Sequence, residues 1–254
     1  MTIFLGDIHG NFKYVKWAIQ NRRLTNCNIV QVGDFGIGTL PKYDEDILVR
    51  FNEFLAEHNV IMYVIRGNHD DPKFFKGNHI QSHLKLLPDY TQLEIDGHNI
   101  LFVGGAVSID RKFSLEKMQT AASYGLDTPL YWFDEAFVLD EEKIKTIKGV
   151  DIVVTHTAPE WCHPDNRNGL GDFVMQFVED DPSLEKDLLE ERKLLSKMFN
   201  MLRENGNQIR KHYYGHFHRN EITLNGYTEH ILLGINEMVT LDERSDDYYE
   251  NLFN

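Results

Sequence analysis

Five short stretches of this sequence are rich in side chains that bind metal ions or transfer protons. Aspartate, asparagine and histidine recur in these stretches, which are GDIHG (6–10), GDFG (33–36), GNHDD (67–71), THT (155–157) and GHFH (215–218). Together they offer carboxylates, imidazoles and an amide, but no thiolate. This mixture of oxygen and nitrogen ligands suits divalent first-row metals such as manganese, iron or zinc. The stretches hold enough ligands for two ions and therefore predict a metal site.

The charge balance of such a site favours a phosphate ligand. If Asp7 and Asp34 are ionised and the ligating histidines are neutral, two dications leave a local excess of about two positive charges. That local charge attracts phosphate even though the chain carries a formal net charge of −14. The net charge also disfavours nonspecific binding to nucleic acids, which depends on Lys and Arg side chains at the phosphates.

Each polar stretch directly follows an apolar run of strand length. Three of these runs, TIFL, NIVQV and VIMYVI, alternate with helical patterns over residues 11–23 and 44–58. The order β-α-β-α-β predicts parallel strands with helices on both faces of the sheet. Because ligands bind beyond the carboxyl ends of such strands, the polar stretches should converge on one rim. Turns and helix caps also favour Asp and Asn, but they do not explain five occurrences after strands.

The second half of the chain contains more antiparallel elements. Residues 90–105 form a pattern of two strands around an Asp-Gly turn, and EITLNGYTEHILL predicts a hairpin with Asn225 and Gly226 at its turn. DIVVT and, less clearly, KHYY are further strands, and residues 182–205 form a long helical pattern. We expect one α/β domain over residues 1–254, with a loop-rich insertion at 108–135 and an acidic tail from about residue 242.

Composition indicates a folded protein without a membrane anchor. Hydrophobic residues make up 42% of the chain and aromatic residues 12%, which argues against disorder. The longest apolar runs have the length of strands, so no transmembrane helix is expected. The start, MTIFLGDIHG, lacks the pattern of a signal peptide. A cytoplasmic location is therefore predicted, and no pattern indicates an oligomeric state.

The remaining candidate ligands show no metal-binding spacing. Cys27 and Cys162 are the two cysteines, and without CxxC spacing they predict neither a disulfide nor a thiolate zinc site. Six further histidines also lack ligand spacing, namely those at positions 58, 79, 83, 98, 212 and 230.

The ordered set GDIHG, GDFG, GNHD, THT and GHFH resembles the calcineurin-like metallophosphoesterase superfamily over residues 1 to about 220. That resemblance implies a four-layer αββα sandwich of mixed sheets with two divalent ions at the strand ends. Manganese is the first choice for these ions, with iron, zinc, nickel or cobalt as alternatives. The resemblance assigns Asp7, His9 and His218 to one ion, Asn68, His156 and His216 to the other, and Asp34 to both.

The resemblance also implies a reaction, in which a hydroxide held between the two ions attacks the phosphorus of a phosphate ester. His69 matches the histidine that contacts phosphate and protonates the leaving oxygen. We expect Asp70 to orient His69 or a ligating imidazole, although a turn or a salt bridge explains Asp70 equally well. Arg66 is expected to contact phosphate, with a surface ion pair as its alternative.

The substrate class remains open between related activities. Protein serine/threonine phosphatases of this superfamily carry Asp and Arg three and four residues after the bridging aspartate, where this chain has Ile37 and Gly38. This departure and the paired histidines of GHFH favour a phosphodiester or nucleotide-type substrate. A phosphomonoesterase and a catalytically inactive binding scaffold are the alternatives. Substrate specificity is expected to lie in residues 108–135 and 158–172. Asp110 and Arg111 are expected to pair within the first segment, with contact to the substrate as the alternative.

Overall fold

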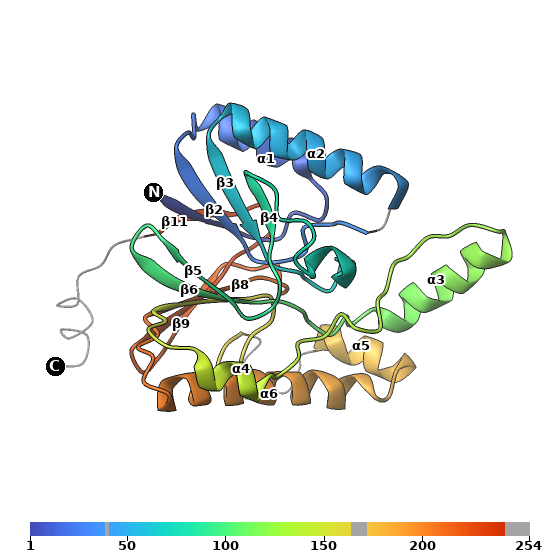
Figure 1. Cartoon of the computed structure of the whole chain (residues 1–254). Helices are drawn as coiled ribbons and strands as arrows, with labels where there is room; N and C mark the ends of the chain where they lie inside the picture. The colour runs from blue at the N-terminus through green and yellow to red at the C-terminus, as the bar shows by residue number, and fades with distance from the viewer. Residues whose placement is uncertain (39–40, 164–171, 242–254) are drawn as a thin grey trace.

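The structure of the chain is a computed structural model, and it describes residues 1–38, 41–163 and 172–241. Two β-sheets packed face to face form its centre (Figure 1). The five-stranded sheet has the order β11 (Met238–Thr240), β1 (Thr2–Leu5), β2 (Cys27–Gln31), β3 (Val60–Val64) and β4 (Leu84–Leu86). The six-stranded sheet has the order β5 (Thr91–Ile95), β6 (His98–Val103), β7 (Ile152–Thr155), β8 (Lys211–Tyr214), β10 (Thr228–Leu232) and β9 (Glu221–Asn225).

Helices cover the outer face of each sheet. The five-stranded sheet carries α1 (Phe12–Asn21) and α2 (Pro41–Glu57), and the six-stranded sheet carries α4 (Glu141–Thr146) and α6 (Leu184–Glu204), with α5 (Asp172–Asp180) beside α6 (Figure 1). The result is the αββα sandwich. The helix α3 (Arg111–Ser123) projects from the body, and a short 3-10 helix spans Pro72–Phe75 (Figure 1).

The alternation of side chains along β1 shows why each sheet has one helix-covered face and one sheet-covered face. Ile3 and Leu5 face the layer of α1 and α2, whereas Phe4 faces the other sheet. The Phe4 ring stacks on Tyr213 of β8, with ring centroids 3.5 Å apart. All of these side chains are buried, so the chain forms separate apolar cores outside and between the sheets.

Several sequence-based predictions are corrected by the fold. Helices lie on one face of each sheet, not on both, because the other faces bury each other. The predicted insertion at 108–135 contains the 13-residue helix α3. The β9–β10 turn consists of residues 226 and 227, one position beyond the prediction, because Asn225 still pairs with Thr228.

Other elements were not predicted, and one prediction cannot be compared. The strands β4 and β11 and the helices α4 and α5 have no counterpart in the sequence analysis. The predicted acidic tail from about residue 242 lies outside the described residues. No helix in the described parts of the chain combines the length and hydrophobicity needed to span a bilayer.

Candidate metal centre

The carboxyl ends of β1, β2, β3, β7 and β8 bring the five polar stretches together, and Asp34 lies where two groups of ligands meet. The first group is Asp7, His9, Asp34 and His218, and the second contains Asp34, His156 and His216. Within each group, the candidate ligand atoms lie within 4.8 Å of one another. The placement agrees with the ligand sets that the resemblance implies, and Asp34 belongs to both groups.

The first group combines two carboxylates with two imidazoles. The Nε2 atoms of His9 and His218 are 3.0 Å apart. His218 Nε2 lies 3.3 Å from Asp7 Oδ2, and His9 Nε2 lies 3.8 Å from Asp34 Oδ2. Asp7 and Asp34 are buried, whereas His9 and His218 reach the surface, so the group opens to solvent on its histidine side.

The second group converges on the amide oxygen of Asn68. Asn68 Oδ1 lies 3.0 Å from His156 Nε2 and 2.9 Å from His216 Nδ1. His156 Nε2 is also 3.2 Å from Asp34 Oδ1. The other ring nitrogen of His156, Nδ1, lies 2.8 Å from the carbonyl oxygen of Val32. A proton on Nδ1 makes this hydrogen bond, so Nε2 is the nitrogen available to a metal.

The backbone of the strand-end loops is shaped to present these ligands. Asp34 and His216 have positive φ angles, 54° and 70°, which turn the chain sharply at the end of β2 and β8. Gly67 and Gly215 allow the loops to approach the carboxylates closely. A Cβ atom at Gly67 would lie 2.1 Å from Asp34 Oδ1, and one at Gly215 would lie 2.1 Å from Asp7 Oδ1.

The polar atoms of the centre fit a bound divalent cation. Asp7 Oδ1 is buried and has no hydrogen-bond partner among the described residues, so a buried carboxylate oxygen is left for a cation. Burial alone would lower the pKa of His156, but the Asp34 carboxylate outweighs it and raises this pKa to about 9. The Asp34 carboxylate therefore favours positive charge at this position, which a bound divalent cation would supply. Oxygen and imidazole donors together are the set expected for manganese, iron or zinc.

His69 lies at the margin of the centre. Its backbone N–H donates to Asp34 Oδ1 at 2.9 Å, which fixes its position relative to the ligand shared by both groups. Its ring lies edge-on to His9, with centroids 5.5 Å apart. The ring nitrogens form no hydrogen bond with the described residues, and the side chain is partly exposed. The imidazole is therefore placed to exchange protons with a bound substrate or solvent.

Asp70 holds backbone rather than an imidazole, which corrects the expectation that it orients His69. Its carboxylate is fully buried and accepts hydrogen bonds from four backbone N–H groups. These N–H groups belong to Phe35, Gly36, Ile37 and Gly67. Asp70 therefore ties the loop after β2, which carries Asp34, to the loop after β3.

Arg66 is also a structural residue, and the expected phosphate contact is wrong. Its Nε and Nη2 atoms donate to Asp89 Oδ2 at 3.0 and 2.8 Å. The remaining donors bind the carbonyl oxygens of Asp134, Glu135 and Ala136. All five N–H groups of the guanidinium are thus engaged, and none is left for a phosphate. Arg66 fastens the end of the 108–135 segment to β3.

Two residues that the sequence analysis missed support the second group. Asn68 Nδ2 donates to Ser108 Oγ at 2.9 Å, and Ser108 Oγ donates to Glu135 Oε2 at 2.9 Å. Ser108 and Glu135 are both buried. A polar residue just after the apolar run ILFVGGAV was the signal that could have identified Ser108, because the other site residues follow strands in the same way.

The ion pairs that hold the 108–135 segment differ from the expected pair of Asp110 and Arg111. Arg111 pairs with Asp181 at 2.5 Å and with Asp187 at 2.8 Å, so the predicted pair with Asp110 is wrong. These ion pairs link the start of α3 to the junction of α5 and α6. Residues 164–171, which are part of the second predicted specificity segment, lie outside the described residues.

A family model described as calcineurin-like phosphoesterase matches residues 2–220. No curated protein matches the chain. Among solved structures, a putative 5'-nucleotidase from Staphylococcus aureus is 12% identical with a TM-score of 0.48, over 95% of this chain and 51% of that chain. The phosphopantetheinyl hydrolase PptH from Mycobacterium tuberculosis is 11% identical with a TM-score of 0.45, over 92% and 90% of the two chains. GAP50, the anchor in the inner membrane complex of Plasmodium, is 16% identical with a TM-score of 0.42, over 92% and 70%. This chain therefore spans about half the length of the nucleotidase.

Proposed function

The chain belongs to the calcineurin-like phosphoesterase family and is a metal-dependent phosphoesterase, and on that premise we propose that it hydrolyses phosphodiester or nucleotide-type substrates at a centre of two divalent ions. Manganese is the first candidate for both ions, with iron, zinc, nickel or cobalt as alternatives. The observation that carries the substrate preference is the engagement of all five Arg66 donors by protein oxygens. A phosphomonoester dianion gains most from a free guanidinium, and Arg66 does not offer one.

The loop after β2 supports the same preference over a protein serine/threonine phosphatase. Ile37 is fully buried in the core under α1 and α2, so its position supplies no carboxylate. Gly38 has a φ angle of 113°, and a Cβ atom there would lie 2.2 Å from the Asp71 Cβ atom. An arginine therefore cannot replace Gly38 in this backbone without a shift of the Asp71 loop.

In the proposed reaction, the protein's residues divide between holding the ions and transferring a proton. The two ions, when bound, would bind the phosphate oxygens and lower the pKa of the attacking water. Asp34 would hold both ions, while the neutral Asn68 amide would bind one without adding a negative charge that repels phosphate. His69, partly exposed at the margin of the centre, would protonate the leaving oxygen.

The test compares hydrolysis of a chromogenic phosphomonoester with hydrolysis of the matching phosphodiester. Protein stripped of metal with a chelator is assayed alone and after addition of manganese, and Asp34→Ala protein serves as the control for contaminating enzymes. We expect turnover that depends on added metal and a diester-to-monoester ratio of kcat/KM above one. A ratio below one would assign the monoesterase activity instead, and no turnover with any of the divalent metals named above would favour the inactive scaffold.

A further inference from the structure

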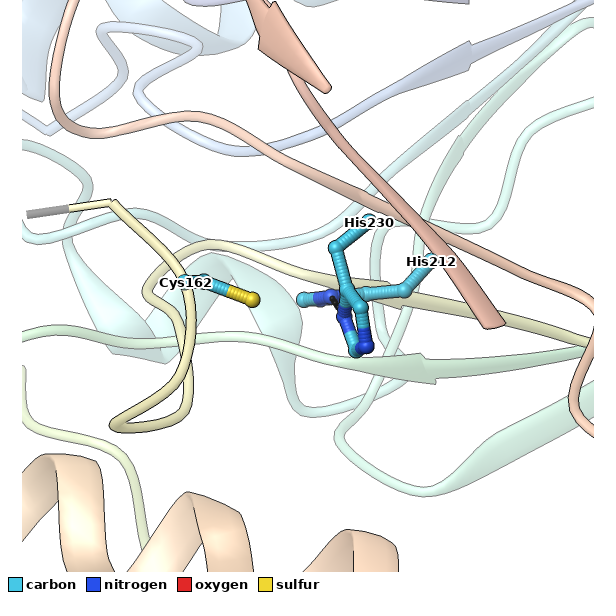
Figure 2. Close-up of side chains that lie close together, drawn as sticks. All are labelled: Cys162, His212 and His230. Carbon is cyan, nitrogen blue, oxygen red and sulfur yellow. Dashed lines mark hydrogen bonds between the residues drawn. The ribbon is translucent and has the colours of Figure 1, made fainter. Parts of the chain in front are cut away.

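A further cluster of candidate metal ligands, apart from the catalytic centre, lies on the outer face of the six-stranded sheet, under α6. It consists of Cys162, from the loop after β7, His212 of β8 and His230 of β10 (Figure 2). One ligand atom of each residue lies within 4.8 Å of the other two, and all three residues are buried. His212 and His230 are direct partners in the parallel register of β8 and β10, so their proximity is set by the sheet. In Figure 2 the Cys162 sulfur points towards the two imidazoles.

The hydrogen bonds around the imidazoles keep both of them neutral. Trp161 Nε1 donates to His230 Nε2 at 3.1 Å, and because an indole can only donate, this nitrogen carries no proton. The Nδ1 atoms of His230 and His212 are 2.9 Å apart, so the His230 proton lies between them. His212 Nε2 lies 2.6 Å from Thr155 Oγ1 and donates to it. Burial also lowers the pKa of both imidazoles. Neutral imidazole is the form that binds metals.

A buried arginine beside Cys162 would stabilise the thiolate form of this cysteine. Arg192 is buried, and its Nη2 donates to the carbonyl oxygen of Cys162 at 2.7 Å. Its Nε and Nη1 atoms have no hydrogen-bond partner among the described residues. Burial raises the pKa of the Cys162 thiol, while the charge of Arg192 acts in the opposite direction. A buried guanidinium with two unused donors is costly beside a neutral thiol, and an anionic sulfur would offset that cost.

We propose that Cys162, His212 and His230 bind one zinc ion, at a structural site separate from the catalytic centre. Zinc is the metal of first choice because a thiolate and two imidazoles, without a carboxylate, form one of its usual ligand sets. With zinc bonds of about 2.3 Å to sulfur and about 2.0 Å to nitrogen, tetrahedral geometry needs the two nitrogens about 3.3 Å apart. The imidazoles therefore have to separate by only a few tenths of an ångström. Tyr214 is buried in the same cluster as Cys162, and its side chain acts to lower the pKa of the thiol.

Zinc binding would change the proton positions in a defined way. The thiol releases its proton to solvent, the His230 proton moves from Nδ1 to Nε2, and both Nδ1 atoms then face the ion. His212 keeps its Nε2 hydrogen bond to Thr155. Trp161 loses its acceptor, because the protonated Nε2 of His230 can no longer accept, so the environment of this indole must change. The site would fasten the loop after His156, which leads into the predicted specificity segment 158–172, to β8 and β10.

Cobalt distinguishes this site from the catalytic centre, because cobalt bound to a thiolate gives a strong near-ultraviolet charge-transfer absorption that oxygen and imidazole ligands do not give. The full chain is expressed with cobalt in place of zinc, as wild type and as Cys27→Ala. The chain has two cysteines, so in Cys27→Ala a thiolate band can come only from Cys162. We expect the band in both proteins, with an intensity that corresponds to one thiolate-bound cobalt ion per chain. Added zinc should displace this cobalt ion and abolish the band. Absence of the band in folded Cys27→Ala would overturn the proposal.

Further variants assign the ligands. His212→Gln and Cys162→Ser should each lose the band and about one equivalent of zinc relative to wild type, as measured by elemental analysis. A band that persists in Cys162→Ser would also contradict the assignment. If Cys162→Ser does not fold, the Cys27→Ala spectrum alone decides. Zinc addition should also shift the tryptophan fluorescence of the wild type, but not that of Trp161→Phe, and an equal shift in both proteins would contradict the predicted change at Trp161.

Discussion

Asn68 donates a hydrogen bond from its side-chain amide to Ser108 Oγ at 2.9 Å, although the two residues are 40 positions apart in the chain. The contact directs the amide nitrogen away from the candidate metal centre and the amide oxygen towards His156 and His216. The hydroxyl of Ser108 is itself fixed, because it donates to Glu135. The orientation of a neutral ligand thus depends on a segment that contributes no ligand of its own.

Ser108→Ala should therefore weaken metal binding at the group formed by Asn68, His156 and His216. Without its hydrogen-bond acceptor, the Asn68 amide can rotate, and loss of such outer contacts costs about 10- to 100-fold in metal affinity. Calorimetric titration of the metal-free protein with manganese measures the effect. Ser114→Ala is the matched control, since Ser114 is also buried and hydrogen-bonded but contacts Asp110 instead. Equal manganese affinity in Ser108→Ala and wild type would contradict the role of Ser108.

Asp34→Ala should affect both ions at once, because Asp34 belongs to both ligand groups. We expect elemental analysis to show loss of both ions, and phosphoesterase activity to fall by more than about 100-fold. Asp71→Asn is the control, because Asp71 lies in the loop that carries Asn68 but its carboxylate binds Lys73. Two ions retained in Asp34→Ala would rule out the shared position.

His69→Asn should retain the metals and lose turnover, because its ring nitrogens form no hydrogen bond with the ligand groups among the described residues and its backbone N–H, which holds Asp34, is kept in the variant. Loss of a general acid lowers kcat by about 100- to 10,000-fold. The loss should shrink for esters with a good leaving group, which departs without a proton. A series of aryl esters with graded leaving-group pKa measures this dependence, and His79→Asn serves as the control outside the centre. The same loss for every leaving group would argue against proton donation by His69.

The contribution of two buried glutamates, Glu191 and Glu135, to the free energy of unfolding should fall as the pH rises from about 5 to 8. Burial raises the pKa of Glu191 from 4.5 to about 7 and that of Glu135 to about 8. Between 4.5 and these values the folded state keeps protons that the unfolded state releases, so the stabilisation from these two groups is fully present below about pH 4.5 and is lost as the pH rises to the folded-state values. For Glu191 the full loss is up to about 3 kcal/mol.

Urea unfolding of Glu191→Gln at pH 5 and pH 8 checks this prediction. The change in free energy of unfolding from pH 5 to pH 8 should be more favourable in the variant than in the wild type, by up to about 3 kcal/mol. Glu190→Gln is the matched control, since Glu190 is the exposed neighbour on the same helix. The same change in free energy of unfolding between pH 5 and pH 8 in Glu191→Gln and in the wild type would show that Glu191 does not carry the effect.

The strands that hold the candidate metal centre could be predicted because their signal is local. TIFL, the first apolar run, coincides with β1, and VIMYVI covers β3, so the polar residues after them fall at strand ends as expected. The weak run KHYY is also a strand, β8. Parallel pairing then places these ends on one rim, as the connection rules for β-α-β units require.

The roles of Arg66 and Asp70 could not be predicted because they depend on distant partners. Both residues stand in the polar stretch after β3 beside Asn68 and His69, and in the sequence all four are equal candidates for chemistry. In the fold, Arg66 makes five hydrogen bonds to four protein oxygens, which uses all the N–H groups of the guanidinium. The Asp70 carboxylate accepts from four backbone N–H groups. Only the hydrogen-bond partners in the folded chain distinguish a structural residue from one that is available for chemistry.

The sequence alone predicts the candidate metal ligands of this protein, because each candidate follows its strand within a few residues and the order of strands places it. Tertiary packing defines what surrounds them. It buries the sheets against each other instead of under helices on both faces, and it brings Ser108 to Asn68. It also joins Cys162 to His212 and His230, which share no spacing in the chain. The physical reason is range: strand periodicity and turns are set by neighbouring residues, whereas burial and hydrogen-bond partners are set by surfaces that meet only when the chain is folded.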